Sequence, residues 1–157
     1  GPGGYTGLRV ACAAAKTLAE AVGAACVPVP TALVALHGYR RGSGGAGPAA
    51  VALASKSDSA WVFVEGDGDA TAARFIHAAT VGEVLTRRGV SVLIADAHLP
   101  GAIREACVGC GVSVVAPALS AAACLEVSAG LGAIDPALLV PFYAREPDAV
   151  TLWKRRA

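Results

Sequence analysis

Two long stretches without a charged side chain, Ala21–Tyr39 and Ala106–Leu125, constrain the fold of this sequence more than any other feature. Both approach the length of about 20 apolar residues that a membrane-spanning helix needs. Glycines and prolines interrupt each of them, at 23, 28, 30 and 38 in the first and at 109, 111 and 117 in the second. Because proline breaks a helix and glycine favours turns, each stretch predicts a buried strand joined to a buried helix, in a protein without a membrane span.

The composition predicts one folded domain over residues 1–157. Hydrophobic residues make up 55% of the sequence and charged residues 16%, against about 25% charged in an average soluble domain, which excludes a disordered chain. The net charge of +1 and the aromatic content of 5% argue against a protein that holds nucleic acid by its own charge or by base stacking. The basic run Lys154-Arg155-Arg156 is read as a solvated chain end, with weak contact to an RNA phosphate backbone as the alternative.

The spacing of apolar residues predicts a mixed α/β fold. Thr6 and Thr31 are read as N-caps of the first two helices, and Val90–Ala95 as a strand buried on both faces. Helices are predicted over 6–22, 31–37, 81–88, 100–109, and from 117 or 119 to 128. Strands are predicted over 25–29, 49–54, 60–65, 74–79, 90–95 and 112–115.

Five cysteines lie scattered in apolar segments: Cys12, Cys26, Cys107, Cys110 and Cys124. Their odd number and apolar surroundings favour reduced thiols in a cytoplasmic core over a disulfide framework. Cys107 and Cys110 form a CxxC motif, but no second ligand pair stands at the spacing of a zinc site. The motif also falls at the end of a predicted helix rather than at its start, where a redox pair is expected. Packing in the core is therefore predicted for the pair, whose role the sequence leaves open.

The acidic run Glu65-Gly66-Asp67-Gly68-Asp69 is predicted to be a hairpin turn, because DG dipeptides between strands favour turns. It lacks the ligand spacing and the closing glutamate of a calcium loop. His37, His77 and His98 lie far apart and have no second ligand at helical spacing. No metal site is therefore expected.

Asp96-Ala97-His98 follows a predicted buried strand, the position where α/β proteins often place functional side chains. Acid–base chemistry and a loop aspartate that caps the next helix both fit this position. The cap is the favoured interpretation. No serine lies in a GxSxG elbow, so a serine hydrolase is not predicted.

The opening GPGGYTG runs directly into the first predicted helix. Glycine lets a backbone approach an anion closely, and the free N–H groups and the dipole of a helix N-terminus favour negative charge. The loop has neither the GK[ST] of a Walker loop nor the GxGxxG spacing. A turn that packs closely is an equal alternative, as is a tag remnant at Gly1 and Pro2. Residue chemistry alone gives no complete catalytic constellation.

Three patches nevertheless resemble one known family. GPGGYTGLRVACAAAKTLAEAVG, residues 1–23, resembles the signature of the bacterial TsaB (YeaZ) family, GPGSFTGLR followed by AxAKGLA. VPVPTALVAL at 27–36 resembles the strand and helix that follow this signature, and LLVPFYAREPDA at 138–149 resembles the closing PxYLRxPxA-like motif. The resemblance runs from end to end of the chain, and the first patch is the most specific.

The resemblance implies an actin-like ATPase (ASKHA) fold of the TsaD/TsaB type, formed by one glycoprotease-like domain with a degenerate nucleotide site. It implies a non-catalytic scaffold partner of TsaD in threonylcarbamoyladenosine modification of the tRNA adenosine beside the anticodon. The expected partners are a TsaD-like protein, a TsaE-like ATPase or a second copy of the chain, with tRNA reached only through the complex. The chain is expected to be cytoplasmic, with no cofactor of its own and with ATP or ADP bound weakly only in the complex.

The family's contacts are carried over onto the residues that match its signature. The possible degenerate nucleotide loop comprises Gly1, Pro2, Gly3, Tyr5, Thr6 and Gly7. The expected partner interface lies on the matching helix, whose small residues let another helix approach, and comprises Leu8, Arg9, Ala11, Ala14, Ala15 and Leu18.

The sequence also departs from the family pattern. The family opens with a strand bearing an AIDTS-like motif, a hairpin and a first interface helix, all of which are expected before Gly1, so the fold is expected to be incomplete at its N-terminus. ASKSDSAWVF stands where the family often carries a DARR-like motif. The metal histidines of TsaD are missing, which agrees with TsaB.

A second hypothesis is a nucleotide-handling enzyme of the actin-like type. GPGGYTG would then bind phosphate, and Asp96 would be a carboxylate that organises a metal ion. The absence of the first phosphate motif of that fold argues against this hypothesis.

Overall fold

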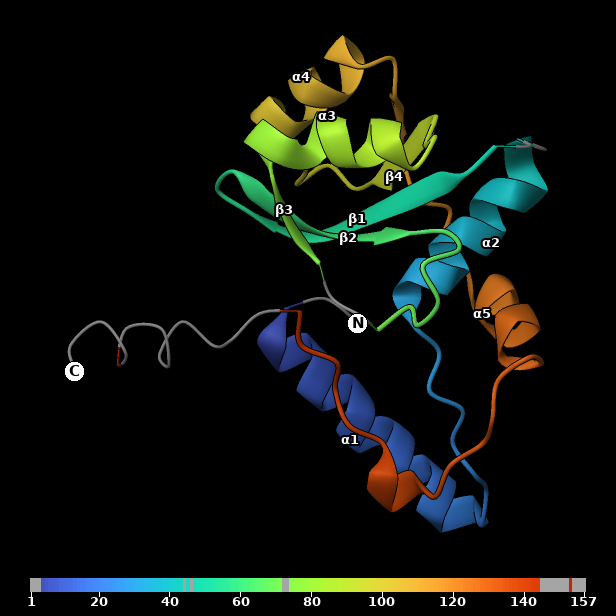
Figure 1. Ribbon diagram of the computed structural model, residues 1–157. Helices are drawn as coiled ribbons and strands as arrows, with labels where there is room; N and C mark the ends of the chain where they lie inside the picture. The colour runs from blue at the N-terminus through green and yellow to red at the C-terminus, as the bar shows by residue number, and fades with distance from the viewer. Residues whose placement is uncertain (1–3, 44, 46, 72–73, 145–152, 154–157) are drawn as a thin grey trace.

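The computed structural model describes residues 4–43, 45, 47–71, 74–144 and 153. Its centre is a five-stranded sheet in the order β3-β2-β1-β4-β5, with helices on both faces (Figure 1). The strands are β1 (Ala49–Lys56), β2 (Ser59–Val64), β3 (Phe75–His77), β4 (Val92–Ala95) and β5 (Ser113–Val115). The helices are α1 (Tyr5–Val22), α2 (Thr31–Ser43), α3 (Ala78–Arg87), α4 (Gly101–Gly109), α5 (Ala121–Ser128) and the short 3-10 helix η1 (Pro136–Leu138).

The sheet combines an antiparallel meander with a parallel half. β1 and β2 form a hairpin in which Val51 faces Phe63, and β3 pairs antiparallel with β2. β4 pairs parallel with β1, and β5 pairs parallel with β4. Helices α3 and α4 make the connections that parallel pairing requires. This confirms the predicted mixed α/β fold.

Alternating residues of the strands divide the core into two layers. Val62 and Leu93 point toward α3 and α4, where they pack with Leu85 and Ile103. Residues next to these along the strands point to the other face of the sheet, where Val51, Trp61 and Ile94 pack against α2. β4 contributes to both layers, which confirms that this strand is buried on both faces.

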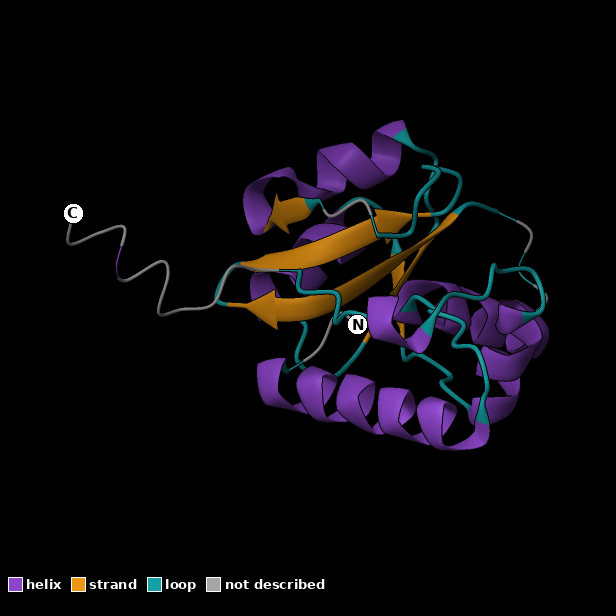
Figure 2. Ribbon diagram, turned by 90° about the horizontal axis from the view of Figure 1, so that it is seen from below, coloured by secondary structure: helices purple, strands orange, loops and turns teal. Residues whose placement is uncertain are grey.

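The helix α1 lies apart from the sheet, on the side of α2 (Figures 1 and 2). Residues 131–143 return beside it and include η1, which contacts α1. We call α1 together with residues 131–143 the α1 arm. The arm joins the rest of the protein at one end through an isolated antiparallel bridge, in which Cys26 N donates to Ile134 O at 3.0 Å and Ile134 N donates to Cys26 O at 2.7 Å.

The strand predicted over 25–29 is wrong, because only Cys26 forms a bridge. Pro28 and Pro30 have no N–H group to donate to a ladder. The cap predicted at Thr6 is also wrong: the N-cap is Gly4, and no side chain caps the helix.

Other boundaries move by a few residues. α2 continues to Ser43 instead of ending near His37, and helix α3 begins at Ala78, inside the strand predicted over 74–79. α5 begins at Ala121 after the N-cap Ser120, whose hydroxyl oxygen accepts a hydrogen bond from Ala123 N at 3.0 Å. A serine cap of this kind satisfies a donor that the first turn of the helix leaves free.

Candidate functional site

The described part of the signature loop forms the first turn of α1. Leu8 N donates to Gly4 O at 3.0 Å, and Thr6 and Gly7 are exposed. The ring of Tyr5 stacks on that of Tyr143, with centroids 4.7 Å apart, and the Arg9 guanidinium lies 5.5 Å from the Tyr5 ring centroid. The structure thus assigns this turn an aromatic contact with residues far along the chain. The predicted loop residues Gly1, Pro2 and Gly3 lie outside the described residues.

One side of α1 faces the returning segment of the arm. Ala19 is its one buried residue, and Leu8, Cys12 and Ala15 are half-buried on the same side. Lys16 Nζ donates to Ala137 O at 2.9 Å, which links the helix to η1. Two of the six residues predicted for a partner interface, Leu8 and Ala15, therefore lie on the inner side of the helix.

The rest of α1 is exposed and carries both apolar and polar side chains, the latter including Thr17 and Glu20. Arg9, Ala11, Ala14 and Leu18, the other four residues predicted for the interface, are all exposed. Among the described residues, twelve large hydrophobic side chains are exposed, and seven of them lie on the arm or at its base: Tyr5, Val10, Leu18, Val22, Val27, Leu138 and Val140. Exposed apolar side chains gathered in one place are typical of an interaction surface. Scattered ones are not, so their grouping is the informative observation.

Asp96 lies in a turn after β4 and is half-buried. Its Oδ1 accepts a hydrogen bond from His98 N at 2.9 Å. The carboxylate does not cap the next helix, because α4 begins after Pro100 without a side-chain cap. The favoured interpretation of Asp96 as a helix cap is therefore wrong, and the residue stabilises its own turn.

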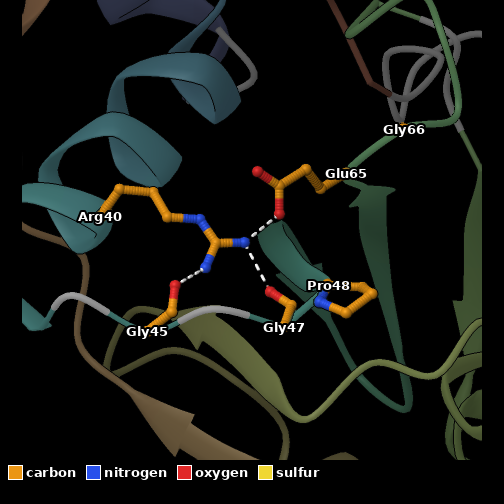
Figure 3. A pocket seen from close by; sticks show the side chains of 6 residues that line it. All are labelled: Arg40, Gly45, Gly47, Pro48, Glu65 and Gly66. Carbon is orange, nitrogen blue, oxygen red and sulfur yellow. Dashed lines mark hydrogen bonds and ion pairs between the residues drawn. The ribbon is translucent and has the colours of Figure 1, made fainter.

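An open pocket of about 570 Å³ lies beside the end of α2, and Arg40 and Glu65 are its charged lining residues (Figure 3). The Arg40 guanidinium donates to Gly45 O, to Gly47 O and to the Glu65 carboxylate, which also accepts from Ala49 N at 3.2 Å. The N–H donors of Arg40 at the pocket therefore already have acceptors within the protein. The pocket also lies where β1 begins, whereas ligands of parallel sheets bind beyond the carboxyl ends of the strands. We interpret these hydrogen bonds as structural contacts that hold the glycine-rich loop before β1 in place.

The acidic run does not form a cation site in the described part of the chain. The Asp67 carboxylate pairs with Arg88, and Asp69 accepts from Thr71 N at 2.8 Å. The hydrogen bonds from the backbone N–H of Thr71 and then from its hydroxyl lower the pKa of the Asp69 carboxyl. Gly66 and Gly68 adopt positive φ angles of 91° and 86°, as the predicted turn between β2 and β3 requires. No group of three potential metal-ligating side chains occurs among the residues described.

The CxxC pair lies where α4 ends. Cys107 is buried, and its burial, more than the charge of Cys110 nearby, raises the pKa of the thiol to about 11. Cys110 is half-buried, and its Sγ donates to Cys107 O at 3.2 Å. All five cysteines are free. A buried thiol with a raised pKa is a poor nucleophile, so the arrangement agrees with a packing role.

A charged contact that the sequence analysis missed joins α2 to α5. Glu126 of α5 accepts hydrogen bonds from His37, at 2.6 Å, and from Arg41. The bond from Arg41 and then that from His37 lower the pKa of the Glu126 carboxyl. The spacing of His37 and Arg41 places them on one face of a helix. This spacing was the available signal, but it did not name a partner 85 or more residues away.

No protein-family model matches the sequence, and no curated protein matches it. A solved structure does, described as the "crystal structure of an uncharacterized protein with similarity to peptidase YEAZ from Pseudomonas aeruginosa". The TM-score is 0.51 at 18% sequence identity, and the match covers 92% of this chain and 70% of that chain. The likeness shows the fold. The protein therefore has a YeaZ-like α/β fold, in agreement with the expected actin-like ATPase type of architecture.

Each helix in the described part of the chain is too short or too polar to cross a lipid bilayer. The prediction of no membrane-spanning helix is confirmed for these residues. The long uncharged stretches instead contain β5 and parts of α1, α2, α4 and α5.

Proposed function

We propose that this protein is a non-catalytic scaffold that binds a TsaD-like protein through the outer side of α1. It would act in this way during threonylcarbamoyladenosine modification of tRNA. The observation that carries the proposal is the set of exposed apolar side chains on α1, of which Val10, Leu18 and Val22 are 63%, 67% and 75% exposed. The YeaZ-like fold supports it as the architecture in which a TsaB-type role is expected.

Small residues on this side suit contact with another helix. Ala11 and Ala14 are exposed between the larger Val10 and Leu18, and small side chains let two helix backbones approach closely. Leu8 and Ala15 lie on the inner side of α1. They would contribute to partner binding by holding the helix in position. Binding would bury apolar area worth roughly 25 cal/mol per Å² before the costs of association are subtracted.

The remaining parts of the proposal follow from the same role. The protein would have no catalytic residue and no cofactor of its own, and ATP or ADP would bind only weakly and through the complex. A TsaE-like ATPase would join the assembly, and tRNA would be reached through the partner rather than by this chain, whose net charge is +1. The complex would act in the cytoplasm.

The test is the affinity of the purified protein for the TsaD-like protein of the same organism, measured by titration calorimetry. Ala11→Arg and Ala14→Arg each place a long charged side chain on the outer side of α1, and either should weaken binding at least tenfold. Ala102→Arg is the matched control, because Ala102 is also an exposed helical alanine, on α4, and this variant should bind normally.

Three results would count against the proposal. Normal binding by both α1 variants would reject the interface, and no binding by the unaltered protein would reject the partner. ATP hydrolysis by the purified chain that Asp96→Asn abolishes would replace the scaffold with the nucleotide-handling enzyme.

A further inference from the structure

The helix α1 is held to the rest of the protein by few side chains. It has 18 residues but buries one of them, Ala19. Its principal packing partner is η1, within its own arm, rather than the sheet. A segment with few buried apolar contacts can open locally at a free energy well below that of global unfolding. The position of α1 therefore depends on the contacts at the two ends of the arm.

At the end of the arm near the sheet, two consecutive aromatic residues make contacts with different elements. Tyr143 stacks on Tyr5 of α1, with centroids 4.7 Å apart and planes at 21°. Phe142 meets Trp61 of β2 edge-on, with centroids 5.7 Å apart and planes at 66°. Successive side chains of an extended segment point in opposite directions, so one residue reaches the helix and the next reaches the sheet.

The sheet side of this link is well anchored. Trp61 is completely buried and Phe142 is packed among core residues that include Val51 and Phe63. The helix side is exposed: Tyr5 is 46% exposed and Tyr143 is half-buried. The stack of Tyr5 on Tyr143 is therefore the contact that can break while the contact of Phe142 with the core remains.

We propose that Phe142 and Tyr143 form a two-sided aromatic clip that sets the position of α1 against the sheet. Breaking the stack of Tyr5 on Tyr143 lets the first turns of α1 leave while the sheet stays folded. The clip thereby regulates the outer side of α1, and this consequence, unlike the clip itself, rests on the proposed function. A clip that holds α1 in place lowers the ordering cost of partner binding, because a preorganised surface loses less conformational freedom.

Hydrogen exchange of the full chain tests the clip without any partner. An aromatic pair contributes about 0.5–1.5 kcal/mol beyond its buried area, so Tyr143→Ala should raise the exchange rates of amides in α1 by about 2- to 10-fold. Exchange in β1 and β4 should not change. Tyr143→Phe keeps the ring but loses the hydroxyl that interacts with Tyr5, so its exchange should lie much closer to that of the unaltered protein than that of Tyr143→Ala. Val140→Ala is the control on the same segment, since Val140 is 72% exposed and should have no effect.

The fluorescence of Trp61 separates opening of α1 from general loosening. Trp153→Phe leaves Trp61 as the one tryptophan of the sequence. In this background Tyr143→Ala should leave acrylamide quenching of Trp61 unchanged, whereas Phe142→Ala should increase it, because Phe142 covers the indole. Unchanged α1 exchange in Tyr143→Ala would overturn the clip. So would equal acceleration in α1, β1 and β4, or increased Trp61 quenching in Tyr143→Ala, because either would mean that the whole core loosens.

Affinity for the TsaD-like protein tests the consequence. The protection factors of amides in α1 give the populations of its docked and open forms. Tyr143→Ala should weaken binding by the factor by which it lowers the docked population, which is at most the factor by which exchange in α1 accelerates. A clear fall in the docked population with unchanged affinity would overturn the regulatory role alone, and the clip would stand. Because the Ala11 and Ala14 variants test the partner surface itself, failure of the proposed function and failure of the clip give different results.

Discussion

Gly38 lies in the middle of α2, against the backbone that leads into α5. A Cβ placed at Gly38 would overlap Ala118 O and would lie 3.1 Å from Ala118 C and 3.2 Å from Ala118 Cβ. Carbon atoms attract each other best at about 3.5–4.0 Å. Gly38→Ala therefore forces α2 and the 118 backbone apart. Neither side of the contact is the end of a flexible side chain, so the strain has no cheap local relief.

Two effects of opposite sign compete in this variant. Alanine is preferred over glycine inside a helix by about 1 kcal/mol, whereas forcing an extra carbon into a packed contact costs about 1–3 kcal/mol. Because the overlap is with backbone, the upper end applies and the net loss is about 2 kcal/mol. For a domain of this size, that loss corresponds to a melting temperature about 4–8 °C lower.

Thermal and urea unfolding followed by circular dichroism would measure this loss. Gly42→Ala is the matched control, because Gly42 lies in the same helix and has nothing within 4 Å of an added Cβ. That variant should be as stable as the unaltered protein, or up to about 1 kcal/mol more stable. If Gly38→Ala is also as stable as the unaltered protein, the close approach of α2 to residue 118 is not as described.

Two other properties follow from the structure. The pKa of Cys107 is raised to about 11 by burial, so between about pH 9 and 11 the unfolded chain loses a proton that the folded protein keeps, and the free energy of unfolding falls by about 2 kcal/mol as pH rises. Cys107→Ala should show a shallower decline than the unaltered protein in urea unfolding over this range, and parallel curves would refute the assignment. Ala54 has a φ of 51° at the irregularity in β1, a conformation that costs a residue with a Cβ about 1 kcal/mol. Ala54→Gly should leave the free energy of unfolding unchanged or raise it by up to about 1 kcal/mol. Ala52→Gly is the control at a regular buried position of the strand and should lower the free energy of unfolding. Loss of stability in both variants would contradict the strained geometry at Ala54.

The sequence was sufficient to predict elements whose pattern is local. Val90–Ala95 has apolar side chains at consecutive positions, so a strand buried on both faces was the natural prediction, and β4 confirms it. Apolar side chains likewise predicted strands over 49–54 and 60–65, and β1 and β2 occupy these positions and pair as a hairpin. In both cases the signal lies within about ten residues of the element that it predicts.

Predictions failed where backbone groups or distant contacts decide the structure. Apolar side chains suggested a strand at 25–29, but Pro28 and Pro30 cannot donate to a ladder, and a single bridge at Cys26 remains. α2 continues past His37 to Ser43, where contacts of its last turns with Glu65 and Glu126 come from distant parts of the chain.

For the candidate site, the sequence predicted the helix but not the distant segment that packs against it. The helix was predicted from local spacing and its interface residues, including Ala11, Ala14 and Leu18, from the family signature, but the inner side of α1 is defined by residues 131–143. The stack of Tyr5 on Tyr143 had no sequence signal, because neither residue carries information on a neighbour so far away.

That stack also has a consequence for synthesis of the protein. The contact joins residues near the two ends of the 157-residue sequence, so the loop that it closes includes nearly every other element. Closing a loop costs entropy that grows with its length, and contacts distant in sequence form late in folding. Because a chain emerges from the ribosome N-terminus first, α1 is synthesised before Tyr143, and the stack that positions it can form only afterwards. Until Tyr143 emerges, the apolar surfaces on both sides of α1 remain open to chaperones and to other nascent chains.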